Sequence, residues 1–278
     1  MERTYINEAQ KAIGGTVKVQ GFIENLRNSK YMAFIVLKDI TGKLQITVEK
    51  EDHPDLVGTI DQLTPDSVIT VTGKVVENDY VKMGGVEMIP ESIEVESTAD
   101  ALPIVRKEIA ATKKKKAVER SSIDQRIDYR WIDLRTDENQ LMFKAQSCFV
   151  NAMRKFLLDR NFIEIHTPKL IAAASESGSE VFKVDYFDRN AYLAQSPQFY
   201  KQMAMAAGFE RIFETGPVFR AEKSYTNKHA TEFSGFDLEF SYITSFKDVM
   251  KMEEELLTAG LQAVKDNYGE QIKELFGQ

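Results

Sequence analysis

Five residues between positions 220 and 233 have the types and spacing expected of a nucleotide site. Arg220 and Glu222 are two residues apart, so on a strand they would point to the same face. The loop that follows adds a cation and an imidazole at Lys228 and His229, and Phe233 offers a flat ring. A purine triphosphate needs such a set: a guanidinium for phosphate, a carboxylate for an exocyclic amine and a ring for stacking. These residues predict a site for a purine nucleotide.

The part of the chain before residue 105 is expected to form a small barrel. Residues 16–96 contain about five short runs of strand character separated by turn signals, with one helix-like segment over residues 54–62. A set of about five strands without a long helix indicates a five-stranded barrel of the OB type. We therefore assign residues 1–105 to an N-terminal domain of this kind.

The next segment, residues 97–120, breaks the strand pattern. Its lysine run over residues 113–116 is compatible with a solvated linker and with a contact to an RNA backbone. We assign residues 106–138 to a linker or hinge between two domains.

The remaining residues, 139–278, carry the pattern of a mixed domain. Apolar residues recur at helical spacing over residues 139–160, and helices are expected over 197–208 and 246–268. Strands are expected over residues 181–193, 211–221 and 236–243. Strands and helices without a repeating βαβ unit predict an α+β fold with a largely antiparallel sheet.

The composition fits a protein of the cytoplasm. The chain has 278 residues, a net charge of −7 and no apolar run that approaches the length of a membrane span. Its single cysteine, Cys148, cannot form an internal disulfide and is expected to be a buried apolar residue. The net charge argues against a protein that coats nucleic acid by bulk electrostatics, but it does not exclude local reading of RNA.

Several segments occur in an order that resembles the class II aminoacyl-tRNA synthetases. They are residues 128–135, residues 161–168, residues 192–202 and the segment around Arg220, which is similar to motif 2 of that class. From about Thr16 onward the chain resembles the aspartyl-tRNA synthetases in their archaeal- and eukaryote-like form. The resemblance implies an aspartate–tRNA ligase that uses ATP to form aspartyl-adenylate and passes the aspartate to tRNA. It also implies an anticodon-binding barrel, a class II catalytic domain and a homodimer.

The resemblance assigns aspartate binding to Glu176, Gln198, Lys201 and Arg220, with Arg220 as the catalytic residue that bridges the aspartate carboxylate and the α-phosphate of ATP. Lys201 would hold the side-chain carboxylate and favour aspartate over asparagine, because an amide leaves the ammonium uncompensated. An exposed loop acid at Glu176 and a solvated helix lysine at Lys201 are the alternatives that the sequence leaves open.

For ATP, the resemblance implies that Glu222 accepts from the adenine amine and Phe233 stacks the base. Lys228 and His229 would reach the outer phosphates beside Arg220. The family usually has arginine where Lys228 stands, so the charge is kept while the bidentate fork is lost.

In the barrel, Arg27, Phe34 and Gln45 match the positions with which this family reads the anticodon of tRNA, and Glu87 is a further candidate. Phe34 would stack on a base. Because Phe34 heads an apolar strand, packing in the barrel core is the competing interpretation.

Nothing after Tyr242 resembles the third motif of the class or the acidic residues that hold Mg²⁺. The expected Mg²⁺ ligands would thus lie beyond this chain, and no metal site is expected within it. We interpret the sequence as a fragment or truncated product whose catalysis is impaired. A tRNA- or RNA-binding module and an asparagine–tRNA ligase are the alternative functions, and charging of tRNA-Asn beside tRNA-Asp stays open.

Overall fold

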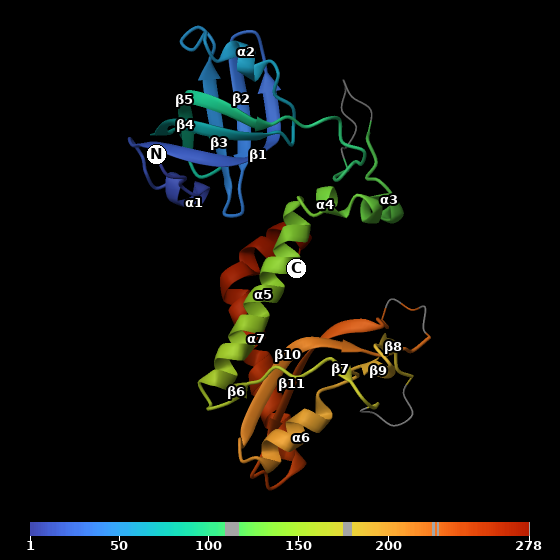
Figure 1. Ribbon diagram of the computed structural model, residues 1–278. Coiled ribbons are helices and arrows are strands. Elements are labelled where there is room, and N and C mark those ends of the chain that lie inside the picture. The colour runs from blue at the N-terminus through green and yellow to red at the C-terminus, as the bar shows by residue number, and fades with distance from the viewer. Residues whose placement is uncertain (109–116, 175–179, 224–225, 227, 278) are drawn as a thin grey trace. The chain divides into compact units, whose positions relative to one another are not determined.

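The computed structural model describes residues 1–108, 117–174, 180–223, 226 and 228–277 (Figure 1). The chain divides into two compact units, Met1–Tyr129 and Arg130–Gln278. The boundary falls within the linker expected over residues 106–138. Among the described helices, none is long and apolar enough to cross a membrane.

The first unit is built around a closed five-stranded barrel with the strand order β1-β2-β3-β5-β4. All neighbouring strands are antiparallel except β3 and β5. This arrangement confirms the predicted barrel of the OB type. The elements of the barrel are β1 (Thr16–Asn28), β2 (Met32–Lys38), β3 (Lys43–Glu49), β4 (Val68–Glu77) and β5 (Val86–Ser97), with the short helices α1 (Ile6–Ala9) and α2 (Val57–Ile60).

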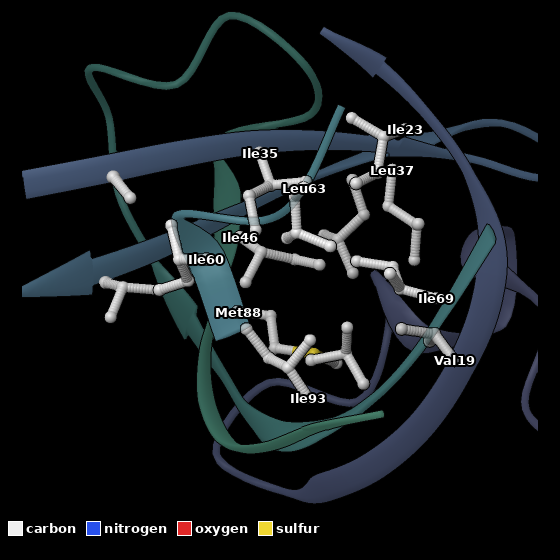
Figure 2. Close-up of a cluster of buried hydrophobic side chains, with 14 of the residues drawn as sticks. Val19, Ile23, Ile35, Leu37, Ile46, Ile60, Leu63, Ile69, Met88 and Ile93 are labelled. Atoms are coloured by element: carbon white, nitrogen blue, oxygen red, sulfur yellow. The ribbon is translucent and has the colours of Figure 1, made fainter. Parts of the chain in front are cut away.

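The barrel is filled by aliphatic side chains that alternate along the strands. On β2, Ile35 and Leu37 are fully buried, while Phe34 and Val36, which alternate with them, are half-buried on the outer face. Figure 2 shows Ile35, Leu37 and their neighbours pointing into one cluster. Because successive strand residues face opposite sides, this alternation fixes which side chains can meet a ligand outside the barrel.

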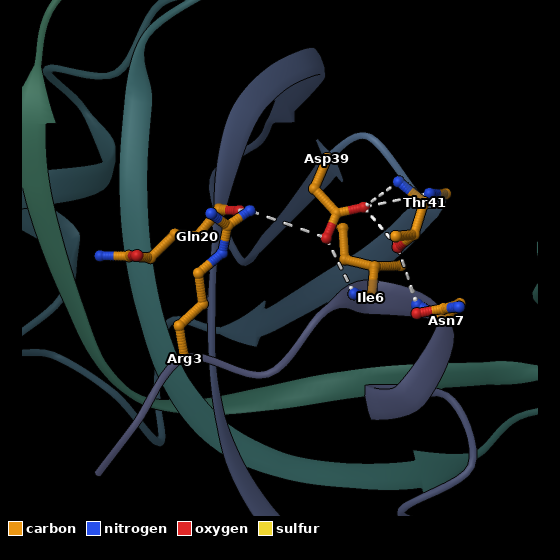
Figure 3. A network of polar contacts seen from close by, with 7 residues as sticks. Arg3, Ile6, Asn7, Gln20, Asp39 and Thr41 are labelled. Atoms are coloured by element: carbon orange, nitrogen blue, oxygen red, sulfur yellow. Dashed lines mark hydrogen bonds and ion pairs between the residues drawn. The ribbon is translucent and has the colours of Figure 1, made fainter. Parts of the chain in front are cut away.

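The buried carboxylate of Asp39 ties the N-terminal segment to the barrel (Figure 3). Its oxygens accept hydrogen bonds from the backbone N–H groups of Ile6 at 2.9 Å, Thr41 at 2.7 Å and Gly42 at 3.1 Å. Arg3 lies 3.9 Å away as an ion-pair partner. These contacts join the segment before β1 to the turn after β2, so Asp39 is a structural anchor.

The second unit is a mixed α+β unit with two small sheets, of order β11-β10-β6 and β7-β9-β8. Strands β10 and β11 form a long antiparallel hairpin, and β6 runs parallel to β10. Helix α3 (Ile123–Asp128) still belongs to the first unit. The helices described in the second unit are α4 (Arg130–Asp133), α5 (Asp137–Leu158), α6 (Gln198–Ala206) and α7 (Phe246–Phe276). Its strands are β6 (Ile163–Glu164), β7 (Leu170–Ile171), β8 (Lys183–Tyr186), β9 (Arg189–Leu193), β10 (Arg211–Phe219) and β11 (Glu232–Phe240).

The core of the second unit lies between α5, α7 and one face of the β10–β11 hairpin. Met153 and Leu157 of α5 and Leu256 of α7 are buried against Phe213 of β10, which stacks on Phe236 of β11 at 5.8 Å. Helices α5 and α7 run side by side in Figure 1. This packing leaves the opposite face of the hairpin for other contacts.

Some predicted elements differ in their limits. The strand expected over residues 181–193 is a hairpin of β8 and β9, since Phe187 adopts the left-handed region with φ of 56° at the turn. Strand β10 ends at Phe219 rather than at residue 221, and α7 continues to Phe276. Cys148 is half-buried rather than buried, because its neighbour Phe149 takes the place that faces the core.

Candidate active site

The β10–β11 hairpin presents two chemically different faces. Residues directly opposite one another on antiparallel strands share a face, and the face alternates along each strand. The pairs Glu214–Asp237 and Val218–Phe233 therefore lie on one face, while Phe213 and its partner lie on the face packed against α5 and α7. The first of these faces is called the site face below; it carries Glu214, Val218, Phe233, Asp237 and Glu239.

Lys201 projects from α6 onto the site face. Its side chain is buried, with 6% of the residue exposed, and its ammonium forms ion pairs with Asp237 and, at 3.1 Å, with Glu239. Burial by itself disfavours the charged ammonium, but the hydrogen bonds and charges of Asp237 and Glu239 outweigh it and raise the pKa of Lys201. Lys201 is thus a fixed, permanently charged group at neutral pH, and its interpretation as a solvated helix lysine is wrong.

The same contacts bear on the predicted preference of Lys201 for aspartate. The prediction assumes an ammonium whose charge would be uncompensated beside an asparagine amide. In the structure, two carboxylates already compensate the charge. An ammonium has three N–H donors, so a donor remains for a ligand oxygen, but an amide oxygen could accept it as well. The compensated charge gives no preference by itself, so selection of aspartate by Lys201 stays a prediction.

Asp237 and Glu239 are functional candidates that sequence reasoning missed. They alternate with apolar residues in the strand Phe236–Phe240, and this pattern places both acids on one face. The pattern was readable, but their partner Lys201 is 36 residues from Asp237 in sequence, and only the tertiary structure brings the three together.

Gln198 is the first residue of α6, three positions before Lys201. It is half-buried, and its backbone N–H donates to Ser196 Oγ at 3.4 Å. Because residues three apart on a helix lie on the same side, Gln198 and Lys201 share one side of α6, as the sequence predicted.

Arg220 follows β10 directly. Its backbone N–H donates to the carbonyl of Thr231 at 2.9 Å, and its guanidinium carbon lies 5.5 Å from the centroid of the Phe233 ring. Arg220 and Phe233 are both exposed to solvent. The structure therefore brings together the guanidinium and the ring of the predicted nucleotide site. Glu222 is exposed beyond the end of the strand, so strand geometry does not set its orientation relative to Arg220.

Lys228 and His229 lie on the loop between β10 and β11, and both are exposed. His229 Nδ1 is 2.5 Å from Thr226 Oγ1, and the Lys228 N–H donates to the same oxygen at 3.4 Å. Glu176 lies outside the described residues, as does the lysine run over residues 113–116. The roles of these residues stay predictions.

Glu214 is a third residue that sequence reasoning missed. Its carboxylate accepts from the Thr167 N–H at 2.8 Å, the Thr167 hydroxyl at 2.7 Å and the Lys169 ammonium at 2.9 Å. Burial would raise the pKa of Glu214, but these donors outweigh it and hold the pKa below its ordinary value. The network joins β10 to the segment Thr167–Lys169.

The predicted RNA-reading residues lie on the outer surface of the barrel. Arg27 of β1 is the register partner of Phe34 on β2, and Gln45 of β3 is the partner of Glu87 on β5. Phe34 is half-buried and faces away from the core. Packing of Phe34 in the core is therefore the wrong interpretation.

Glu87 organises the polar part of this surface. It is 8% exposed and accepts from the Thr47 hydroxyl at 2.5 Å, Gln45 Nε2 at 3.2 Å and Asn78 Nδ2 at 2.8 Å. Gln45 Nε2 also donates to Thr47 Oγ1 at 3.1 Å. Thr47 and Asn78 had no sequence signal, since a lone hydroxyl or amide next to a strand is common. The network fixes the orientation of the Gln45 amide.

No group of three or more His, Cys, Asp or Glu side chains in the described ranges could hold a metal ion.

Comparisons with known proteins place these features in a family. The family described as tRNA synthetases class II (D, K and N) matches residues 122–276, and the OB-fold nucleic acid binding domain matches residues 17–96. The chain is 44% identical over 264 residues to an aspartate–tRNA(Asp/Asn) ligase of Methanopyrus kandleri, covering 94% of this chain and 59% of that protein. It is 40% identical over 271 residues to an aspartate–tRNA(Asp) ligase of Picrophilus torridus, covering 97% of this chain and 61% of that protein.

Solved structures share the fold. Asparaginyl-tRNA synthetase from Pyrococcus horikoshii, complexed with asparaginyl-adenylate, matches with a TM-score of 0.88 at 29% identity, covering 100% of this chain and 62% of that one. Aspartyl tRNA synthetase from Entamoeba histolytica matches with a TM-score of 0.79 at 29% identity, covering 98% of this chain and 57% of that one. The chain thus spans about three fifths of the length of these relatives. Since the family match covers more than half of its 278 residues, the chain belongs to the class II tRNA synthetases of the D, K and N group.

Proposed function

We propose that this chain carries the amino-acid-activating site and the anticodon-reading barrel of an aspartate–tRNA ligase. The observation that carries the proposal is the pairing of two unlike groups along the β10–β11 hairpin. At one end Lys201 sits between two carboxylates, and at the other end Arg220 lies beside the Phe233 ring. An amino acid joined to a nucleotide needs both ends. Its polar amino-acid part needs charged partners, and its nucleotide part needs a cation for phosphate and a ring for the base.

In the reaction, a carboxylate oxygen of aspartate attacks the α-phosphorus of ATP, and the bond to pyrophosphate breaks. Arg220 stabilises the negative charge that develops on the phosphoryl oxygens. Phe233 stacks on the adenine, Glu222 accepts from its amine, and Lys228 with His229 contacts the outer phosphates. A hydroxyl of the tRNA 3′ end then attacks the aspartyl carbonyl, and AMP leaves.

Lys201, Gln198 and Glu176 would hold the amino acid. The raised pKa of Lys201 keeps its ammonium charged when a ligand displaces water from the pocket. Asp237 and Glu239 fix the position of that ammonium, so that the remaining N–H donor points to a defined place.

The barrel would bind the anticodon through Phe34 and the polar network beside it. Phe34 stacks on a base, while Arg27, Gln45 and Glu87 meet base edges. The Methanopyrus relative is named for tRNA(Asp/Asn) and the Picrophilus relative for tRNA(Asp). Similar proteins therefore include ligases named for one tRNA and ligases named for two. The same proposal includes that the protein forms a homodimer, requires Mg²⁺ and is located in the cytoplasm.

Asparagine–tRNA ligase is the second candidate. It is favoured by the compensated charge of Lys201 and by the TM-score of 0.88 with the asparaginyl enzyme of Pyrococcus horikoshii. Aspartate is preferred because the relatives of 40% and 44% identity are named aspartate ligases, whereas the asparaginyl structure is 29% identical.

The test is binding of two non-hydrolysable sulfamoyl analogues, of aspartyl-adenylate and of asparaginyl-adenylate, measured by calorimetry. We expect the aspartyl analogue to bind at least about tenfold more tightly, a difference of about 1.4 kcal/mol. A preference for the asparaginyl analogue would move the assignment to the second candidate. Failure of both analogues to bind, with retained binding of tRNA, would replace the enzyme assignment by an RNA-binding module.

A further inference from the structure

Two glycines face each other at the middle of the site face. Gly216 of β10 is the direct register partner of Gly235 of β11. Each is two residues from a side chain of the site face, Gly216 from Glu214 and Gly235 from Asp237, so a Cβ at either glycine would point to that same face. Between the end near Lys201 and the end near Phe233, these two positions of the site face therefore present backbone without a side chain.

The fold does not require glycine at either position. Neither residue adopts a positive φ, so any residue could take these backbone conformations. A Cβ at Gly216 would lie 3.6 Å from Glu214 Oε1 and from Lys169 Cε, and a Cβ at Gly235 would lie 3.7 Å from Val218 Cγ2. Both are ordinary van der Waals contacts.

Gly260 of α7 differs from these two glycines, because a Cβ would not fit there. A Cβ at Gly260 of α7 would lie 2.6 Å from the ring of Phe149, so packing against α5 demands glycine there. Glycine in a strand interior weakens a sheet through backbone entropy and missing side-chain contacts. The pair on the site face thus carries a penalty that neither conformation nor packing explains.

Their position on the hairpin supplies an explanation. Along β11, Gly235 lies two residues from Phe233 and two from Asp237, which is about 7 Å in each direction at the rise of a strand. A ligand that contacts the ring of Phe233 and the ammonium of Lys201 at once must cross the glycine pair. Side chains at these two positions would stand between the ligand and the sheet.

We infer that Gly216 and Gly235 form the floor of the binding site, on which an aminoacyl-adenylate lies flat against the hairpin backbone. This inference rests on the proposed function and extends it: the two positions determine how closely the ligand approaches the sheet. They are positioning residues that act through the absence of a side chain.

The test uses the full chain and the variants Gly235→Ala, Gly235→Val and Gly216→Ala. The matched control is Gly269→Ala, because a Cβ there, on α7, would lie 3.8 Å from the nearest atom, Lys265 Cγ. The aspartyl sulfamoyl analogue is the probe, its Kd is measured by calorimetry, and the melting temperature is measured without ligand. We expect the Kd to rise about tenfold for the alanine variants and further for valine. The melting temperatures should stay equal to that of the parent or rise, and the control should bind like the parent.

The outcomes that overturn the inference are distinct from failure of the proposed function. If the parent binds the analogue and the Ala and Val variants bind it equally well, the inference that Gly216 and Gly235 form the floor of the site is wrong. The proposed function then still stands. A clear fall in melting temperature without ligand would show that the fold itself needs these glycines, which also overturns the inference. If the parent binds no analogue, the proposed function fails and the inference fails with it.

Discussion

At the residue scale, the chemistry of the site depends on how buried charges are paired. Lys201 is buried between Asp237 and Glu239, and Glu214 accepts three hydrogen bonds two residues from the glycine pair. Breaking a buried ion pair by removing one partner leaves an uncompensated charge, which is strongly destabilising. Variants of these residues are therefore expected to lose stability, so experiments on the proposed site need a readout of stability beside that of binding.

Replacing Lys201 by methionine should abolish binding of the aspartyl sulfamoyl analogue while ATP binding persists. The reason is that Lys201 lies at the end of the site away from Phe233. Stability should also fall, by about 3 kcal/mol, because Asp237 and Glu239 lose their cation. The matched control is Lys247→Met, at an exposed lysine of α7. Calorimetry that finds ATP and the analogue weakened to the same degree would remove Lys201 from the amino-acid end.

The same ion pairs predict a loss of stability in alkali. The pKa of Lys201 is raised in the folded state, so its contribution is complete below the ordinary lysine pKa. The contribution is lost as the pH rises through the folded value. Lys201→Met should therefore lack this alkaline component when denaturant unfolding is followed against pH.

Replacing Phe34 by alanine should weaken tRNA binding by about 1–3 kcal/mol, the range for one stacked base. The melting temperature should stay near that of the parent, since Phe34 faces outward. Ile35→Ala is the matched control at the next residue, which is fully buried, and it should lower stability by about 2–5 kcal/mol. Unchanged affinity for tRNA in the Phe34 variant would take it out of the RNA surface.

At the scale of elements, the site is assembled from segments that packing and polar contacts hold against the β10–β11 hairpin. The hairpin is supported from behind by α5 and α7, and Glu214 ties β10 to the segment before β7. The sequence predicted the barrel strands and α5 well, because alternation and helical spacing are local signals. It did not predict the turn at Phe187, since a non-glycine residue with positive φ leaves no pattern.

Some residues of the candidate site could be predicted from sequence and others could not. Arg220 and Phe233 could be paired from motif spacing, and the structure places them 5.5 Å apart. The cluster around Lys201 could not be foreseen, because it joins a helix to a strand more than 30 residues later. The burial of Lys201 and the compensation of its charge are likewise tertiary properties, so the premise of an uncompensated ammonium could not be checked from sequence.

Gly260→Ala should destabilise the second unit by about 1–3 kcal/mol, because its Cβ would meet the Phe149 ring at 2.6 Å and force α5 and α7 apart. Gly269→Ala on the same helix should instead stabilise it by roughly 0.5–1 kcal/mol, since its Cβ would make only an ordinary contact, at 3.8 Å from Lys265 Cγ. Denaturant unfolding of both variants provides the comparison. Equal stability of the two would mean that the close contact of the helices is not maintained.

Replacing Glu214 by glutamine should lower stability by about 1–3 kcal/mol at neutral pH. The pKa of Glu214 is held below its ordinary value, so its contribution is present above that ordinary value and is lost as the pH falls through the folded value. The gap between the stabilities of parent and variant should therefore stay constant from neutral pH down to the ordinary glutamate pKa of 4.5 and shrink below it. A gap that stays constant below that pKa as well would show that ionisation of Glu214 does not support the network.

At the scale of the whole molecule, the chain consists of two units with separate cores. All buried residues of the barrel core lie between Ile6 and Ile93, and Arg106 pairs with Asp66 at 2.6 Å to tie the start of the linker to the barrel. The two halves of the proposed function, reading of the anticodon and activation of the amino acid, thus fall on separately folded parts.

A fragment of residues 1–107 should therefore fold by itself. It contains the complete barrel core, the Asp39 anchor and the Arg106–Asp66 pair. We expect one cooperative thermal transition by circular dichroism and retained affinity for an anticodon stem-loop. A broad, non-cooperative transition would show that the barrel depends on the rest of the chain.

The most direct test of the proposed site is a crystal structure of the chain with the aspartyl sulfamoyl analogue. The predicted result is adenine stacked on Phe233, the sulfamoyl group beside Arg220, and the aspartyl group at Lys201, with the linking atoms over Gly216 and Gly235. A ligand bound away from the site face of the β10–β11 hairpin, or bound there in the reverse orientation, would contradict it.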